Sequence, residues 1–163
     1  MRNKRIAFLG AFLALALICS YVESLIPFYF GIPGVKLGLA NIVVVIMLYT
    51  AGAKEAVCIS TLRILLSGFL FGNMFSILYS LAGGLLSFFV MYAVKRTKKF
   101  GIIPISVCGG ISHNIGQLSV AVLVVENYRI YSYLPVLLFA GILTGFLIGV
   151  AAQEVIFRIH KTM

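Results

Sequence analysis

The sequence contains no aspartate, and its four acidic residues are all glutamate. This absence excludes metal chemistry that relies on clustered aspartates. Charged residues make up only 10% of the 163 residues, against roughly 25% in a typical soluble domain. Hydrophobic residues make up 62%, which is more than a soluble fold of this size can bury and rules out a disordered chain. The sequence therefore predicts a protein that uses the lipid bilayer as part of its solvent.

Cysteine is scarce as well. Cys19, Cys58 and Cys108 form an odd set, and each lies in an apolar segment. No disulfide framework follows from them, and their spacing does not fit a metal site. We expect all three to be packed inside the protein, and we expect neither a metal nor a cofactor.

Apolar segments recur along the whole chain, and we interpret residues 1–163 as a single membrane domain. A helix that crosses about 30 Å of hydrocarbon needs roughly 20 residues, so the chain has room for about six crossings. The boundary between the second and third segments is the least distinct. The predicted fold is an all-α integral membrane bundle with six transmembrane helices, at residues 6–22, 37–51, 55–70, 73–94, 102–125 and 134–157.

The positive charges indicate the orientation of these helices. If the amino terminus is cytoplasmic, ten of the 13 Lys and Arg residues fall on the inside, and only Lys36 and Arg129 fall outside. The net charge of +9 is then a topology signal, and we expect no nucleic-acid partner. Both termini of this cell-membrane protein are predicted to be cytoplasmic. The inside group is Arg2, Lys4, Arg5, Lys54, Lys95, Arg96, Lys98, Lys99, Arg158 and Lys161.

Arg63 is the one basic residue that falls within a predicted span. It follows Lys54 by nine positions, which places it about 14 Å above the cytoplasmic edge by helix rise. A charge at this depth is costly unless it has a partner or a wet cavity. Arg63 is therefore either a structural residue that pairs with backbone carbonyls or snorkels, or part of an anion-binding site.

Other polar residues are predicted at a similar depth in the outer half of the membrane. Asn41 lies on the second span, about 7 Å below its outer edge, and Lys36 lies at that edge. His113 and Gln117 are four residues apart on the fifth span, so they share a helix face. We expect an outward-facing cavity, although Lys36 could be a headgroup anchor and the others a structural polar cluster. The candidate binding residues are Lys36, Asn41, Arg63, His113, Asn114 and Gln117.

Small residues follow one face of the first span. Ala7 and Ala11 form a small-xxx-small pair, as do Gly10 and Ala14. Such pairs allow helices to approach closely. They are either ordinary packing within the bundle or a docking face for another membrane subunit.

The first outer loop, residues 23–35, has a length and aromatic content that suit a lid or an interfacial belt.

Two strings carry a resemblance to a known family. They are PGVKLGLANIV at residues 33–43 and GGISHNIGQ at residues 109–117. Over nearly its whole length the chain resembles the family labelled heptaprenyl diphosphate synthase component I, also called Gx transporter. That family in turn is similar to the S components of energy-coupling factor (ECF) transporters. The resemblance implies six helices, cytoplasmic termini and a pocket under the first outer loop. It also implies that Ala7 and Ala11 dock on a transmembrane coupling subunit.

The two family labels imply different functions. A prenyl diphosphate synthase binds magnesium diphosphates through aspartate-rich motifs, which this chain lacks, so we expect it not to be an enzyme. We expect a binding subunit for a small anionic solute, a carboxylate or a phosphate. Since no phosphate-binding loop is present, ATPase partners would supply the energy. The alternatives are a non-catalytic accessory protein in isoprenoid or quinone metabolism or associated electron transfer, and a structural membrane subunit without a ligand.

Overall fold

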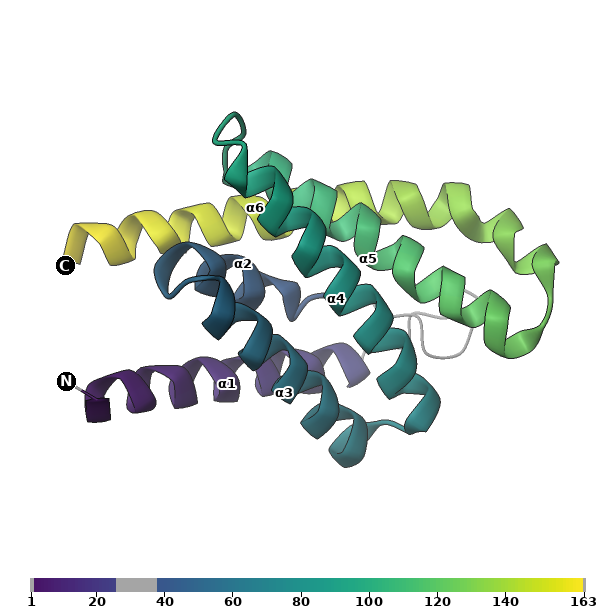
Figure 1. Cartoon of the computed structure of the whole chain (residues 1–163), viewed down its shortest axis with the longest axis horizontal. Helices are drawn as coiled ribbons and strands as arrows, with labels where there is room; N and C mark the ends of the chain where they lie inside the picture. The colour runs from purple at the N-terminus through teal and green to yellow at the C-terminus, as the bar shows by residue number, and fades with distance from the viewer. Residues whose placement is uncertain (1, 26–37, 163) are drawn as a thin grey trace.

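The computed structural model describes residues 2–25 and 38–162, and the statements below concern those residues. Within them the secondary structure is helical, without strands. In chain order the helices are α1 (Arg2–Leu25), α2 (Asn41–Thr50), α3 (Ala53–Phe71), α4 (Met74–Arg96), α5 (Ile102–Val125), the 3₁₀ helix η1 (Tyr128–Tyr133) and α6 (Leu134–Thr162) (Figure 1). The predicted all-α fold is thus confirmed.

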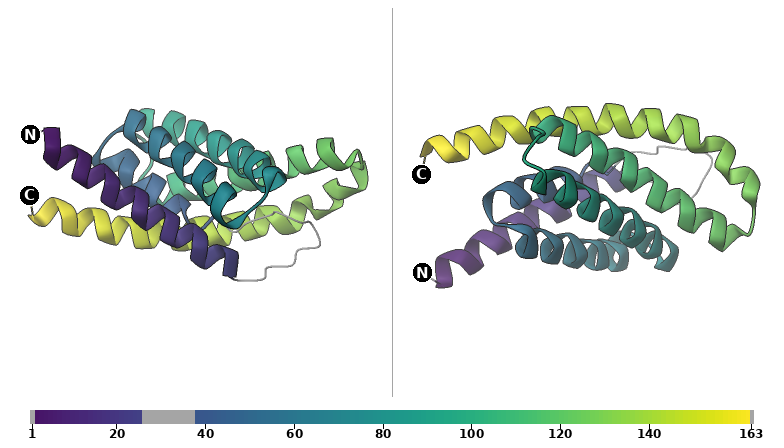
Figure 2. Two further views of the ribbon diagram at one scale, coloured as in Figure 1. Left: turned by 90° about the horizontal axis from the view of Figure 1, so that it is seen from below. Right: turned by 45° about the horizontal axis from the view of Figure 1, so that its top comes forward.

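The helices form one elongated bundle. α5 packs most extensively against α6 and α4, while α1 packs mainly against α3. The start of α1 and the end of α6 lie at the same end of the bundle, and the α3–α4 turn and η1 lie at the opposite end (Figures 1 and 2). We call these the terminal end and the far end of the bundle.

α2 forms the centre of the core. Its residues from Val43 to Leu48 are each at most 3% exposed, because apolar side chains cover the helix on every side. Residues of all five other α-helices join this apolar cluster. At its carboxyl end, Nζ of Lys95 donates a hydrogen bond of 2.5 Å to the carbonyl oxygen of Leu48. This contact satisfies one of the carbonyls that a helix end leaves without a partner.

Two expected boundaries near the first outer loop need correction. α1 continues to Leu25, so Glu23 belongs to this helix and not to the loop. α2 begins only at Asn41, because Gly38 has a φ of +78° and starts a tight turn that precedes the helix. Asn41 therefore lies at the start of the helix and not one turn inside it.

Four helical segments are long and apolar enough to cross a membrane. α2 is shorter, and α3 carries three charged residues, Lys54, Glu55 and Arg63, which lower its apolar character. Six crossings therefore remain a prediction, while a membrane protein with several apolar helices is supported. The four segments are Arg5–Leu25, Met74–Arg96, Ile102–Val125 and Tyr128–Ile159.

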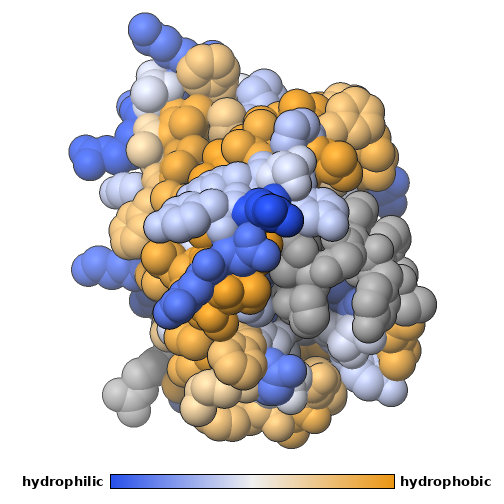
Figure 3. Space-filling model, turned by 90° about the vertical axis from the view of Figure 1, so that its right-hand side faces the viewer, coloured by the Kyte–Doolittle hydropathy of each residue, from blue (hydrophilic) through white to orange (hydrophobic). Residues whose placement is uncertain are grey.

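The surface agrees with a bilayer environment. Large apolar side chains such as Phe69, Leu123 and Phe139 are more than 70% exposed. Extended apolar surface of this kind is rare on soluble monomers and marks contact with a membrane or a partner. Figure 3 shows the far end of the bundle, where hydrophilic residues cross the middle of the face and hydrophobic residues lie above and below them.

Glycines permit the close approach of α5 and α6. A Cβ added to Gly145 would lie 2.8 Å from the carbonyl oxygen of Ser106 and 2.8 Å from Cα of Val107. Both atoms belong to the backbone of α5, so they can give way only if the helices separate. This agrees with the expectation that the later glycines serve internal packing.

We therefore predict opposite effects for two glycine-to-alanine changes. Gly145→Ala should destabilise the protein by about 1–3 kcal/mol through overpacking. Gly10→Ala should be neutral or slightly stabilising, because a Cβ there meets nothing within 4 Å and alanine favours helix. Midpoints of detergent-induced unfolding, followed by circular dichroism, check both. Equal midpoints for the two variants would contradict the close α5–α6 contact.

Candidate functional site

A group of buried polar side chains lies at the amino end of α2, where the apolar core ends. They come from four helices, and each is at most 6% exposed. Burial of polar groups is costly in protein and in lipid unless each is compensated, so their gathering is a functional signal. We call this group the polar cluster: Ser20, Glu23, Asn41, Arg63, His113 and Gln117.

Arg63 lies on α3 and is 5% exposed. Its Nη1 donates a hydrogen bond of 3.1 Å to Oγ of Ser20 on α1. Its Nε is buried and has no hydrogen-bond partner among the described residues. The guanidinium is thus held by α1 through Nη1, while its Nε meets no acceptor in the part of the chain that the structure describes.

Glu23 lies one turn beyond Ser20 on α1. Its Oε1 accepts hydrogen bonds from the backbone N–H groups of Gly38 and Leu39, the latter at 3.3 Å. These groups precede α2, so the carboxylate sits at the positive end of that helix. Its charge also attracts the buried guanidinium of Arg63. Glu23 therefore connects α1, the start of α2 and the charge on α3.

His113 and Gln117 lie on α5 and face Gly83 of α4. A Cβ on Gly83 would lie 3.1 Å from Cε1 of His113 and 2.7 Å from Cγ of Gln117. On another side of the imidazole, a Cβ on Gly38 would lie 3.4 Å from Cδ2 of His113 and 3.0 Å from Nδ2 of Asn41. Two glycines thus make room for the imidazole beside the turn that Glu23 holds.

The side chain of Asn114 contacts α6 and is not part of the polar cluster. Its Nδ2 donates a hydrogen bond of 2.7 Å to the carbonyl oxygen of Leu137 on α6. This contact holds two helices together, which is the structural role that the sequence left open. Lys36, another candidate from the sequence, lies outside the described residues.

Ser20 and Glu23 were not among the candidates from the sequence. Their spacing of three residues places them on one face of α1. A serine and a glutamate on one face near the end of an apolar helix are the signal that could have identified them. Only the packing of α1 on α3 shows that this face meets Arg63.

The conformation of Gly38 leads to a prediction for the polar cluster. Gly38→Ala should cost about 1–2 kcal/mol, because a side chain at a φ of +78° is strained and would press on Asn41. The turn should also shift relative to His113, which weakens any ligand contact there. Unfolding midpoints check the first effect, with Gly10→Ala as a control because a Cβ there meets nothing within 4 Å. If Gly38→Ala is as stable as the control, residue 38 does not have the positive φ described here.

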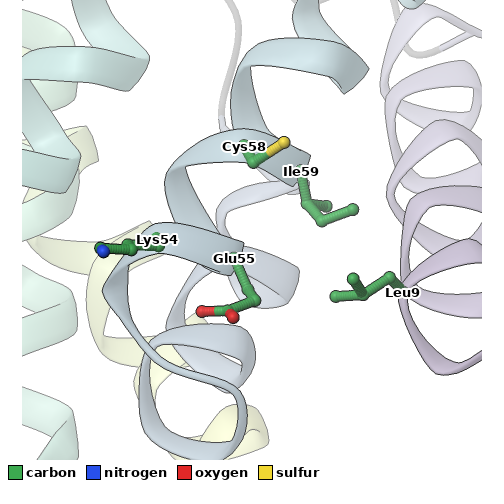
Figure 4. Close-up of a pocket in the computed structure, with 5 residues that line it drawn as sticks. All are labelled: Leu9, Lys54, Glu55, Cys58 and Ile59. Atoms are coloured by element: carbon green, nitrogen blue, oxygen red, sulfur yellow. The ribbon is translucent and has the colours of Figure 1, made fainter. Parts of the chain in front are cut away.

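A second surface feature lies nearer the terminal end. An open groove of about 230 Å³ is lined by residues of α1 and α3. Leu9 of α1 faces the side of α3 that carries Ile59, while the Lys54 side chain extends away from α1 (Figure 4). Cys58 is exposed on this groove, so the expectation that all three cysteines are buried is wrong. Arg5 and Glu55 form an ion pair that joins the two helices beside it.

The small residues of α1 do not pack inside the bundle. Ala7, Gly10, Ala11 and Ala14 are all exposed. Packing within the chain, one of the two interpretations left open by the sequence, therefore does not explain this face.

Within residues 2–25 and 38–162, no group of three or more His, Cys or Glu side chains could hold a metal ion.

These features describe an all-α protein with several helices apolar enough to cross a membrane and a buried polar cluster at the amino end of its central helix. The chain belongs to the heptaprenyl diphosphate synthase component I family, which it matches over residues 12–155. That match confirms the family to which the two sequence strings pointed. No curated protein and no solved structure matches the chain.

Proposed function

We propose that the chain is the substrate-binding subunit of an ECF-type uptake transporter and binds a small anionic solute in the polar cluster. The observation that carries this proposal is the buried Nε of Arg63, which has no acceptor among the described residues. A purely structural arginine would be expected to use its donors within the protein, because an unmade buried hydrogen bond costs about 1–3 kcal/mol. A bound anion would supply the missing acceptor.

The remaining members of the polar cluster suit the same role. Asn41, His113 and Gln117 provide side chains that donate or accept hydrogen bonds, and Asn41 and His113 lie beside the turn held by Glu23. In the proposed orientation both termini are cytoplasmic, and the cluster faces the outer half of the membrane. The common end of the two termini and the excess of positive charge there support this orientation.

The proposed subunit acts by binding and not by catalysis. It has no aspartate for a magnesium diphosphate centre and no phosphate-binding loop. Energy would come from ATPase partners through a transmembrane coupling subunit. The exposed small residues Ala7, Gly10, Ala11 and Ala14 offer that subunit a face on which a second helix can pack closely.

This docking face gives a specific prediction. Ala11→Leu should greatly reduce co-purification with coupling and ATPase subunits, because the larger side chain holds the partner helix away. Binding of the solute should be unchanged, since Ala11 is not part of the polar cluster. Ala151→Leu, at an exposed alanine on α6, is the matched control. If Ala11→Leu still co-purifies with the partner subunits, this face is not the docking site.

Native mass spectrometry of the intact protein, purified gently from its own host, tests the binding function. The proposal predicts a one-to-one adduct of a small polar molecule. The alternative, an accessory protein that presents a prenyl chain, predicts a prenyl lipid adduct, for which the open apolar groove between α1 and α3 is a suitable place. Adducts of bulk phospholipid alone would argue against both functions.

A further inference from the structure

The guanidinium of Arg63 has one edge that Ser20 does not engage. A guanidinium carries two parallel N–H groups along the edge formed by Nε and Nη2, and this fork matches the two oxygens of a carboxylate. Ser20 engages Nη1, which lies outside that edge. The buried Nε is on the edge and has no acceptor among residues 2–25 and 38–162.

Glu23 limits the charge that this place can accept. Glu23 and Arg63 are both buried and carry opposite charges, so a ligand with one negative charge brings the sum of these three charges to −1. A phosphate monoester carries about −1.5 to −2 at neutral pH and would leave a larger uncompensated charge. The cost of burying uncompensated charge is high, which favours the monoanion.

We infer that the ligand is a monocarboxylate whose carboxylate binds the Nε edge of Arg63, and that Glu23 disfavours phosphorylated ligands. This inference rests on the proposed binding function and assigns its substrate class. Two observations carry it together: the buried Nε of Arg63, which has no acceptor among the described residues, and the buried carboxylate of Glu23, which lies one turn from the Ser20 that holds the guanidinium.

The test identifies the chemistry of the molecule that the protein retains. Small molecules are released from purified wild type, Arg63→Lys and Arg129→Lys, and are quantified by mass spectrometry. One portion is treated with a carbodiimide and an amine, which convert carboxyl groups to amides, and another with phosphatase. Arg129 lies in the exposed 3₁₀ helix η1, so its variant is the matched control. Circular dichroism and gel filtration establish that each variant is folded.

The expected molecule is depleted about tenfold or more in Arg63→Lys, because lysine keeps the charge but not the planar fork. It is unchanged in Arg129→Lys, gains one amide and is unaffected by phosphatase. Ser20→Ala, which keeps the guanidinium intact, should deplete it less. An Arg63-dependent molecule that carries phosphate or lacks a carboxyl group would overturn the assignment and leave the binding function standing. If no molecule depends on Arg63 in folded variants, both fail.

Discussion

Glu23→Ala is expected to lower the free energy of unfolding by about 3–5 kcal/mol, the range found when a buried charge loses the opposite charge that compensates it. The alanine leaves the guanidinium of Arg63 buried without an opposite charge among the described residues. It also takes the acceptor away from the N–H groups of Gly38 and Leu39. Detergent-induced unfolding followed by circular dichroism measures the loss.

An exposed ion pair on α6 provides the control for Glu23. Glu154 and Arg158 form an exposed pair on α6 at 2.9 Å, and exposed pairs contribute only about 0–1 kcal/mol. Glu154→Ala should therefore have little effect. In a double-mutant cycle, Glu23→Ala combined with Arg63→Met should recover part of the loss, because the unpaired charge is gone. Fully additive losses would show that Glu23 and Arg63 do not interact.

Arg63→Gln is expected to abolish retention of the solute. Removing one partner from a buried charged contact weakens binding by about 2–5 kcal/mol, which is roughly 30-fold or more. Arg129→Gln, at the exposed η1, should retain the solute fully. The measurement is the occupancy of the one-to-one adduct in native mass spectrometry of folded protein. An unchanged occupancy in Arg63→Gln would mean that Arg63 is structural, as the competing interpretation of the sequence holds.

The later helices were predictable in considerable detail. The fifth span, predicted at residues 102–125, coincides with α5. The fourth was predicted to begin at Asn73, which in the structure caps α4 by accepting a hydrogen bond from the N–H of Ser76 at 2.8 Å. Apolar length and local capping signals lie close together in the sequence, so such boundaries can be found without knowledge of the packing.

The polar cluster was predictable only in part. Arg63, Asn41, His113 and Gln117 stood out because polar residues in apolar spans are rare. Glu23 was assigned to the first outer loop, because the first span was expected to end before it. Asn114 was grouped with His113, although in the structure its side chain bonds to α6. The sequence shows which residues share a helix face, but the helix that this face meets depends on the rotation of each helix in the bundle.

An experimental structure of the protein, purified from its own host without removal of bound molecules, tests the central claim most directly. The account predicts non-protein density beside Arg63, with an acceptor oxygen about 2.7–2.9 Å from Nε. A protein group that accepts the hydrogen bond from Nε, with no such density beside it, would contradict the claim that Arg63 belongs to a ligand site.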